Sequence, residues 1–130
     1  MTFLQPAGWP RPSGYANGIV ASGPIVLVAG QIGWDPITKR VVGGMAAQVE
    51  QALRNIAVIL AEARAEPSDI VRLTWFVTDM QLYRSEAEAI GQGYRRVMGK
   101  HFPVMSVIGV HQLVESDALV EIEATAAQRE

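Results

Sequence analysis

The hydrophobic positions along the chain change their period several times, and each change marks a different predicted element. Valine and isoleucine dominate Ile19–Ile32, and the pair Gly23-Pro24 divides this stretch in two. Branched apolar residues favour strands, and a Gly-Pro pair is typical of a turn. We therefore predict a β-hairpin over Ile19–Ile32. An extended, irregular lead-in, rich in proline and glycine, precedes it over residues 1–14.

Helical spacing replaces this pattern in two later stretches. The first runs from Met45 to about Ala65 and is ended by Pro67, and the second ends near Gly99. In each stretch the apolar residues recur three or four positions apart, which places them along one stripe of a helix. The first stripe consists of Val49, Leu53, Ile56 and Leu60, and the second of Ala87, Ile90, Tyr94 and Val97.

Short runs of bulky apolar residues supply the remaining strands, which are predicted over Ile70–Thr78, Val104–Val110 and Ala118–Ala126. The resulting order is β-β-α-β-α-β-β, without a linker or an internal repeat. This order predicts an α+β fold in which one domain spans residues 1–130 and two helices cover one face of a mixed sheet.

Apolar residues on both sides of that sheet predict an oligomer. In the last strand Val120, Ile122 and Ala124 point to one face. The residues between them point to the other face, namely Leu119, Glu121, Glu123 and Thr125. Since the two helices cover only one face, we expect a second copy of the chain to cover the other.

Composition and charge narrow the classes of function. The 130 residues are 49% hydrophobic and 18% charged, with a net charge of −2, which gives no basic footprint for nucleic acid. The absence of cysteine excludes disulfides, thiol catalysis and cysteine-ligated metals. Residues 1–14 lack a basic stretch followed by an apolar run, and no window of about 18 residues is apolar throughout, so we expect neither a signal peptide nor a membrane span. We expect a cytoplasmic protein that binds neither membranes nor nucleic acid.

Five short segments between Ser13 and Ala126 resemble the motifs of one protein family in their order and spacing. They are SGYANG at Ser13–Gly18, AGQI at Ala29–Ile32, IVRLTWFVTDM at Ile70–Met80, PVMS at Pro103–Ser106 and ALVEIEATA at Ala118–Ala126. No segment is specific alone, but together they resemble the Rid family (reactive intermediate deaminases, also called the YjgF family).

This resemblance implies a chorismate-mutase-like fold and a homotrimer with a central barrel. A small-molecule ligand would bind in clefts between neighbouring subunits. The implied reaction hydrolyses 2-imino or enamino acids to keto acids and ammonia without a cofactor. Glu121 stands where the family has the glutamate proposed to position the attacking water, and a carboxylate can both orient water and move its protons. Tyr15 and Gly30 match positions in the family's ligand cleft.

Three departures from the family pattern change the expected substrate. Met105 replaces the arginine that holds the substrate carboxylate, Val107 replaces a frequent cysteine or threonine, and Gly91 replaces a frequent asparagine. An unpaired carboxylate in an apolar cleft costs several kcal/mol. We therefore predict weak hydrolysis of simple 2-imino acids and a preference for an aromatic or longer substrate.

Other candidates admit a functional and a structural interpretation. Arg11 is the candidate substitute cation, whereas the remaining basic residues are expected to be solvated surface charges; they include Arg72, Arg95, Arg96 and Lys100. Tyr15 can bind a ligand or cap the barrel edge, and Gly30 can offer its backbone to a ligand or serve a turn. Glu123, Trp34 and Trp75 are expected to be structural. His101 and His111 lack a third ligand at a suitable spacing, so no metal site is predicted.

Three functions follow from these observations. The first is a diverged imine- or enamine-hydrolysing deaminase of the Rid type. The second is a non-catalytic trimer that binds a small metabolite in the same clefts. The third, endoribonuclease or translation-inhibitor activity, is a label attached to the family, and the acidic composition disfavours it.

Overall fold

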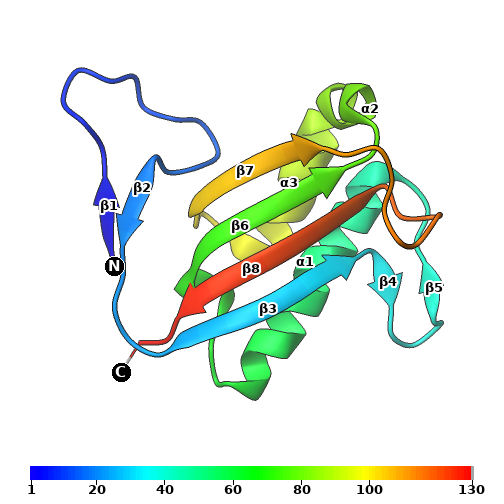
Figure 1. Ribbon diagram of the computed structural model, residues 1–130, viewed down its shortest axis with the longest axis horizontal. Coiled ribbons are helices and arrows are strands. Elements are labelled where there is room, and N and C mark those ends of the chain that lie inside the picture. The colour runs from blue at the N-terminus through cyan, green and yellow to red at the C-terminus, as the bar shows by residue number, and fades with distance from the viewer. Residues whose placement is uncertain (130) are drawn as a thin grey trace.

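A four-stranded mixed sheet forms the centre of the fold, with its strands in the order β3-β8-β6-β7 (Figure 1). The structure is a computed structural model and describes residues 1–129. Strands β6 and β7 are parallel, and the other neighbours are antiparallel. The strands span Ile25–Ile32 (β3), Ile70–Val77 (β6), Val104–Gly109 (β7) and Val120–Ala127 (β8). Three of these strands match the predicted ones to within two residues at each end.

Two long helices, α1 (Met45–Glu62) and α3 (Ala87–Met98), pack on the same face of this sheet (Figure 1). The predicted stripe of α1 is confirmed, since all four of its members are buried. In α3 Ile90 and Tyr94 are buried, whereas Ala87 is exposed. Gly99 ends α3 with a φ of 63°, a backbone conformation that glycine adopts readily. Between the sheet strands lie a 3₁₀ turn, η1 (Pro67–Asp69), and a short helix, α2 (Met80–Ser85).

Alternation along β8 separates the two faces of the sheet as the sequence predicts. Val120, Ile122 and Ala124 are buried beneath the helices, while Glu121 and Glu123 lie on the opposite face. We refer to this opposite face as the open face. The predicted α+β fold, with two helices on one side of a mixed sheet, is confirmed.

The predicted hairpin over Ile19–Ile32 is wrong. Strand β2 (Gly18–Val20) pairs with β1 (Thr2–Leu4) in a separate two-stranded sheet, so part of the lead-in is itself a strand. Gly23, with a φ of 110°, turns the chain away from β3 instead of reversing it alongside. In Figure 1 this N-terminal arm, residues 1–22, extends beyond the ends of the central strands. A second small sheet, formed by β4 (Trp34–Asp35) and β5 (Arg40–Val41), follows β3.

Strand β3 is an edge strand with exposed apolar residues. Leu27 is 77% exposed and Ile25 is 59% exposed. Leu27 faces Thr125 of β8 in the register, which places it on the open face, and nothing in residues 1–129 covers that face. Exposed apolar side chains that lie together on a sheet face commonly mark a contact surface.

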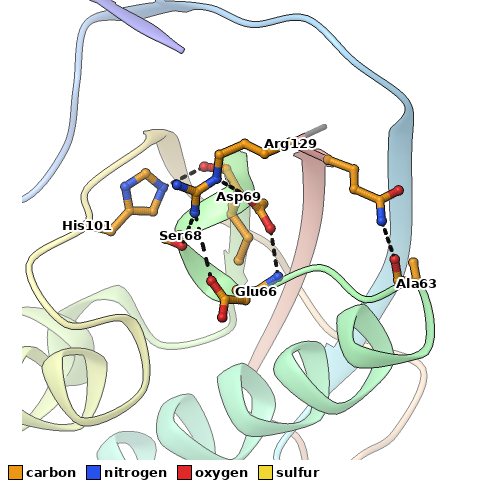
Figure 2. Close-up of polar contacts among 8 residues, drawn as sticks. Ala63, Glu66, Ser68, Asp69, His101 and Arg129 are labelled. Carbon is orange, nitrogen blue, oxygen red and sulfur yellow. Dashed lines mark hydrogen bonds and ion pairs between the residues drawn. The ribbon is translucent and has the colours of Figure 1, made fainter.

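A polar cluster ties the end of β8 to η1 (Figure 2). Arg129 Nε donates to Asp69 Oδ1 at 2.8 Å, and Arg129 Nη2 donates to Ser68 Oγ at 2.7 Å. Asp69 Oδ2 accepts from the Glu66 backbone N–H at 2.8 Å. Burial alone would raise the pKa of Asp69, but the hydrogen bond from Glu66 and the hydrogen bond and charge of Arg129 together hold that pKa below its ordinary value. The cluster therefore stabilises the fold, and it lies apart from the cavity described next.

Candidate functional site

A cavity of about 610 Å³ lies between the edge strand β7 and helix α3. Its volume is within the range of small-molecule sites. It is lined by Ser13, Gly14, Tyr15, Trp75, Tyr83, Ala87, Ile90, Gly91, Tyr94, Arg95, Phe102, Met105 and Val107. We call it the α3 cavity. Four of the predicted ligand-contacting residues are therefore brought together in one chain, namely Tyr15, Gly91, Met105 and Val107.

Parallel pairing of β6 with β7 directs Met105 and Val107 into this cavity. Met105 lies opposite Leu73 and Val107 opposite Trp75, and both β6 residues face the helices. Register partners share a face of the sheet, so Met105 and Val107 also face the helices and pack on the edge of the core. Met105 and Val107 together form an apolar wall of the α3 cavity.

Aromatic rings form another wall of the α3 cavity. Tyr94 stacks on Phe102, with centroids 5.3 Å apart and an interplanar angle of 8°, and on Trp75 at 6.3 Å and 20°. Tyr83 meets Trp75 edge-on at 6.3 Å. Trp75 is 2% exposed and packs in the core, as predicted, but it also lines the cavity. Its Nε1 is buried and has no hydrogen-bond partner among residues 1–129.

Two tyrosines of the cavity, Tyr83 and Tyr94, have pKa values raised above that of an ordinary tyrosine. Burial raises the pKa of Tyr94, whose hydroxyl donates to the His101 carbonyl at 2.6 Å. Burial also raises the pKa of Tyr83. Among residues 1–129 no carboxylate lines the cavity, and the charged group that these residues place at its wall is the Arg95 guanidinium.

Gly91 and Arg95 are one turn apart on α3, and both line the cavity. A Cβ built on Gly91 would lie 3.3 Å from Arg95 Nη1. The absence of a side chain at Gly91 therefore lets the Arg95 guanidinium lie close to the helix at this position. Arg95 is exposed, as the sequence predicts, but its place at the cavity wall was not predicted. The spacing of four residues on one helix could have indicated it.

Tyr15 reaches the α3 cavity because the N-terminal arm passes along the free edge of β7. The Ala16 backbone N–H donates to the Pro103 carbonyl at 3.1 Å, and Ala16 forms a parallel bridge with Val104. Arg11, the candidate substitute cation, lines a neighbouring cavity of about 360 Å³ that shares Tyr15 and Phe102 with the first. The structure thus places Arg11 outside the set of residues that surround Met105.

Glu121 and Gly30 lie on the open face, away from the α3 cavity. A register irregularity in β3 between Val28 and Gln31 brings Gly30 beside Glu121, so that a Cβ on Gly30 would lie 2.7 Å from Glu121 Cδ. Glu121 is half-buried, and its carboxylate makes no hydrogen bond or ion pair within residues 1–129. Gly30 therefore serves the close packing of the Glu121 side chain.

Glu123 lies further along the open face, in a separate cavity of about 490 Å³. Leu27, Arg72 and Thr74 line the same cavity. Within one chain, the predicted water-orienting Glu121 and the predicted ligand wall at Met105 consequently occupy opposite faces of the sheet. A site that uses both groups requires a second copy of the chain.

Other kinds of site find no support in the part of the chain that is described. Among residues 1–129 no three His, Cys, Asp or Glu side chains come together in a way that could hold a metal ion. His101 Nε2 lies 2.7 Å from the Ile70 carbonyl, which is a structural contact. The helices found in that range are too short or too polar to cross a membrane.

Comparisons with known proteins agree on one family. Residues 10–128 match the family model described as Endoribonuclease L-PSP. The chain is 34% identical over 118 residues to the 2-iminobutanoate/2-iminopropanoate deaminase of Salmonella typhimurium, with 88% of each chain covered. Its structure is similar to that of YyfB from Yersinia pestis, a protein of unknown function of the conserved Rid protein family. That similarity has a TM-score of 0.83, 32% identity and 98% of each chain covered.

Rv2704 from Mycobacterium tuberculosis, a member of the highly conserved YjgF/YER057c/UK114 family, is a further structural relative. It shares 36% identity with the chain at a TM-score of 0.66, and the match covers 88% of this chain and 87% of that one. The matches cover 88% of the Salmonella deaminase, 98% of YyfB and 87% of Rv2704.

Proposed function

The chain belongs to the Endoribonuclease L-PSP family, which includes Rid family proteins, and from that premise we propose that it is a diverged imine- or enamine-hydrolysing deaminase. One observation carries the proposal: the Glu121 carboxylate is packed beside Gly30 without an ion-pair partner in residues 1–129. An unpaired carboxylate on a partly buried strand can accept a proton from water.

The hydrolysis of an imine needs few catalytic groups from the protein. Water adds to the carbon of a C=N bond, and the resulting carbinolamine loses ammonia to give a carbonyl. Glu121 would take a proton from the attacking water and return it to the departing amine. Because the imine carbon is already electrophilic, no nucleophilic side chain or metal is needed.

We place the reaction between two copies of the chain in a homotrimer. Glu121 and Gly30 would come from one copy, and Tyr15, Gly91, Met105 and Val107 from the next. The positions of these two sets on opposite faces of one sheet support this arrangement. The exposure of Leu27 and Ile25 supports a contact surface on the open face, since burying such side chains stabilises an interface.

The apolar wall directs the choice of substrate. Met105 and Val107 offer neither charge nor hydrogen-bond donors, so a short 2-imino acid would place its carboxylate against apolar side chains. A substrate with a longer or aromatic body would bury apolar surface on Met105 and the aromatic wall. We therefore expect simple 2-imino acids to be poor substrates.

Ammonia release from freshly generated imines tests this function. An amino-acid oxidase supplies the imines of alanine, leucine and phenylalanine, and decay of each imine is followed with and without the protein. We expect acceleration that is greatest for the aromatic imine and lost in Glu121→Gln, which keeps the shape of the side chain. Failure to accelerate any imine would contradict an enzyme and favour a protein that binds a small metabolite in the same cavity.

That binding protein is the alternative that Met105 supports, because the apolar wall suits binding without catalysis. RNA cleavage has weaker support. The net charge of −2 supplies little of the electrostatic attraction on which nucleic-acid binding depends.

A further inference from the structure

The α3 cavity contains a cation whose role the proposed hydrolysis does not define. Arg95 lines the cavity, whereas its neighbour Arg96 pairs with Glu50 at 2.8 Å. Glu50 also pairs with Arg54, and the Arg96 hydrogen bond is the main cause that lowers the pKa of Glu50. Arg95 makes no ion pair with any carboxylate in residues 1–129. Two adjacent arginines of one helix thus differ, since one is paired and the other is free beside a cavity.

Gly91 leaves room for the Arg95 guanidinium. The three atoms nearest to a Cβ at Gly91 would be Nη1, Cζ and Nη2 of Arg95, at 3.3, 3.9 and 3.9 Å. A glycine inside a helix destabilises it by about 1 kcal/mol relative to alanine. No positive φ requires glycine at this position. Space beside the guanidinium is the feature of Gly91 that a larger residue would remove.

The remaining walls determine what else the ligand must contain. Trp75, Tyr94 and Phe102 form a continuous aromatic stack, and Met105 and Val107 add an apolar strand edge. Aromatic groups pack favourably on such stacks. Within the described range, residues 1–129, no carboxylate lines the cavity, so an anion is attracted by Arg95 and is not repelled by the other wall residues found there.

We propose that Arg95 binds the carboxylate of a ligand whose aromatic or branched apolar body lies on the Trp75–Tyr94–Phe102 stack. The planar guanidinium can donate two parallel hydrogen bonds to a carboxylate. This inference rests on the proposed function in using the same cavity, and it specifies the substrate class. The anionic group of the ligand is held from helix α3, across the cavity from the strand that carries Met105.

In this arrangement Arg95 selects among ligands and is more than a solvated surface charge. A short 2-imino acid has its carboxylate directly on the reacting carbon. A ligand held at α3 also needs an apolar body large enough to contact the aromatic stack. The position of Arg95 therefore favours aryl-substituted or branched carboxylates over short ones.

Calorimetric titration with two matched probes tests the inference without turnover. The probes are 3-phenylpropanoate and its neutral amide, 3-phenylpropanamide, which have the same body and differ in charge. We expect wild-type protein to bind the carboxylate at least about tenfold more tightly than the amide, the difference made by one charge-assisted contact. Arg95→Gln should abolish that preference by weakening carboxylate binding more than amide binding.

Three further variants separate the causes. Arg96→Gln removes the same charge one residue away and should alter carboxylate affinity by less than about twofold, as expected for a screened charge outside the cavity. Gly91→Leu places a side chain beside the guanidinium and should weaken carboxylate binding while the helix keeps or gains stability. Arg11→Gln tests the neighbouring cation and should leave the preference intact.

Several outcomes would overturn the inference. They are equal affinity for the two probes, no binding of either at millimolar concentration, an unchanged preference in Arg95→Gln, or a preference lost in Arg11→Gln instead. Inorganic phosphate is added as a competitor of 3-phenylpropanoate. If phosphate displaces 3-phenylpropanoate as effectively as a second aryl carboxylate does, the site is a general anion site and the carboxylate assignment is contradicted.

Arg95-dependent binding without ammonia release from any imine would contradict the hydrolase alone. Imine hydrolysis that is insensitive to Arg95→Gln would contradict the Arg95 role alone.

Discussion

Gly30 and Glu121 lie so close that a Cβ on Gly30 would be 2.7 Å from Cδ and 2.9 Å from Cγ of Glu121. The sequence places these residues 91 positions apart, and the pairing of β3 with β8 brings them together. Any residue other than glycine must therefore displace the carboxylate proposed to orient water.

Gly30→Ala should accordingly reduce activity more than stability. The new methyl group meets a side chain that can move, so the free energy of unfolding should change by less than about 1 kcal/mol. We expect kcat/KM for the best imine substrate to fall at least about tenfold because the carboxylate is displaced. Steady-state kinetics and urea unfolding measure the two effects.

The matched control for that change is Gly43→Ala, since a Cβ at Gly43 meets no atom within 4 Å and has no unusual φ to adopt. A double-variant cycle adds a second control. If Gly30→Ala acts through Glu121, it should have no further effect on activity in a Glu121→Ala background. A full additional loss there would show that Gly30 acts by another route.

Met105→Arg should introduce activity on short 2-imino acids. A guanidinium on β7 would give the carboxylate of a short substrate a charged partner where the wild type has a thioether. We expect ammonia release from 2-iminobutanoate to rise at least about tenfold, the value of one charge-assisted bond. Met105→Leu, which keeps the apolar wall, is the control and should stay at the wild-type rate. No gain in the arginine variant would mean that more of the short-substrate site is missing than this contact.

Arg129→Gln should destabilise the fold in a manner that depends on pH. The pKa of Asp69 is lowered in the folded protein, so Asp69 contributes stability above its unfolded pKa of about 4, and this contribution is lost as pH falls through the folded value. The Arg129 side chain is 68% exposed, so the loss at pH 7 should be only about 1 kcal/mol. Urea unfolding at pH 7 and pH 3 should show the difference from wild type narrowing in acid. Arg40→Gln, an exposed strand position, serves as the charge control, and an equal difference at both pH values would contradict the Asp69 pairing.

Leu27→Asp should prevent oligomerisation. Leu27 is 77% exposed on the open face, and a carboxylate buried there in an interface would lose its hydration. Light scattering should give the wild type a mass three times that of the 14.1 kDa chain, and the variant the mass of one chain. Ile37→Asp is the control because Ile37 is 90% exposed in the turn between β4 and β5, away from that face. A wild-type monomer, or a trimeric Leu27→Asp variant, would contradict our assignment of the interface.

The helices and the buried faces of the strands were predictable from the local sequence pattern, whereas the pairing of the first strands was not. The α1 stripe and the alternation of β8 are local patterns that burial follows directly. The partner of β2 depends on the direction in which Gly23 turns the chain. Sequence composition around Gly23-Pro24 fits a corner and a reversal equally well, so the hairpin prediction failed.

The candidate site shows the same division between local and tertiary information. The resemblance located Tyr15, Gly91, Met105 and Val107, which the structure gathers around one cavity. The role of Arg95 was not predicted, because an arginine near the end of a helix is usually a solvated surface charge. Its function depends on the absence of a side chain at Gly91 and on the packing of α3 beside β7, which is tertiary information.

The central claim, that a complete site combines Glu121 of one copy with the α3 cavity of another, is tested most directly by cross-linking between copies. Because the chain has no cysteine, Glu121→Cys and Val107→Cys each carry a single thiol. The two variants are mixed, refolded together, treated with a short bismaleimide and separated under denaturing conditions. We predict a two-chain product in the mixture that exceeds the product of either variant alone, and no such excess with Ile37→Cys in place of Glu121→Cys. A mixture that yields no more two-chain product than its separate components would contradict the claim.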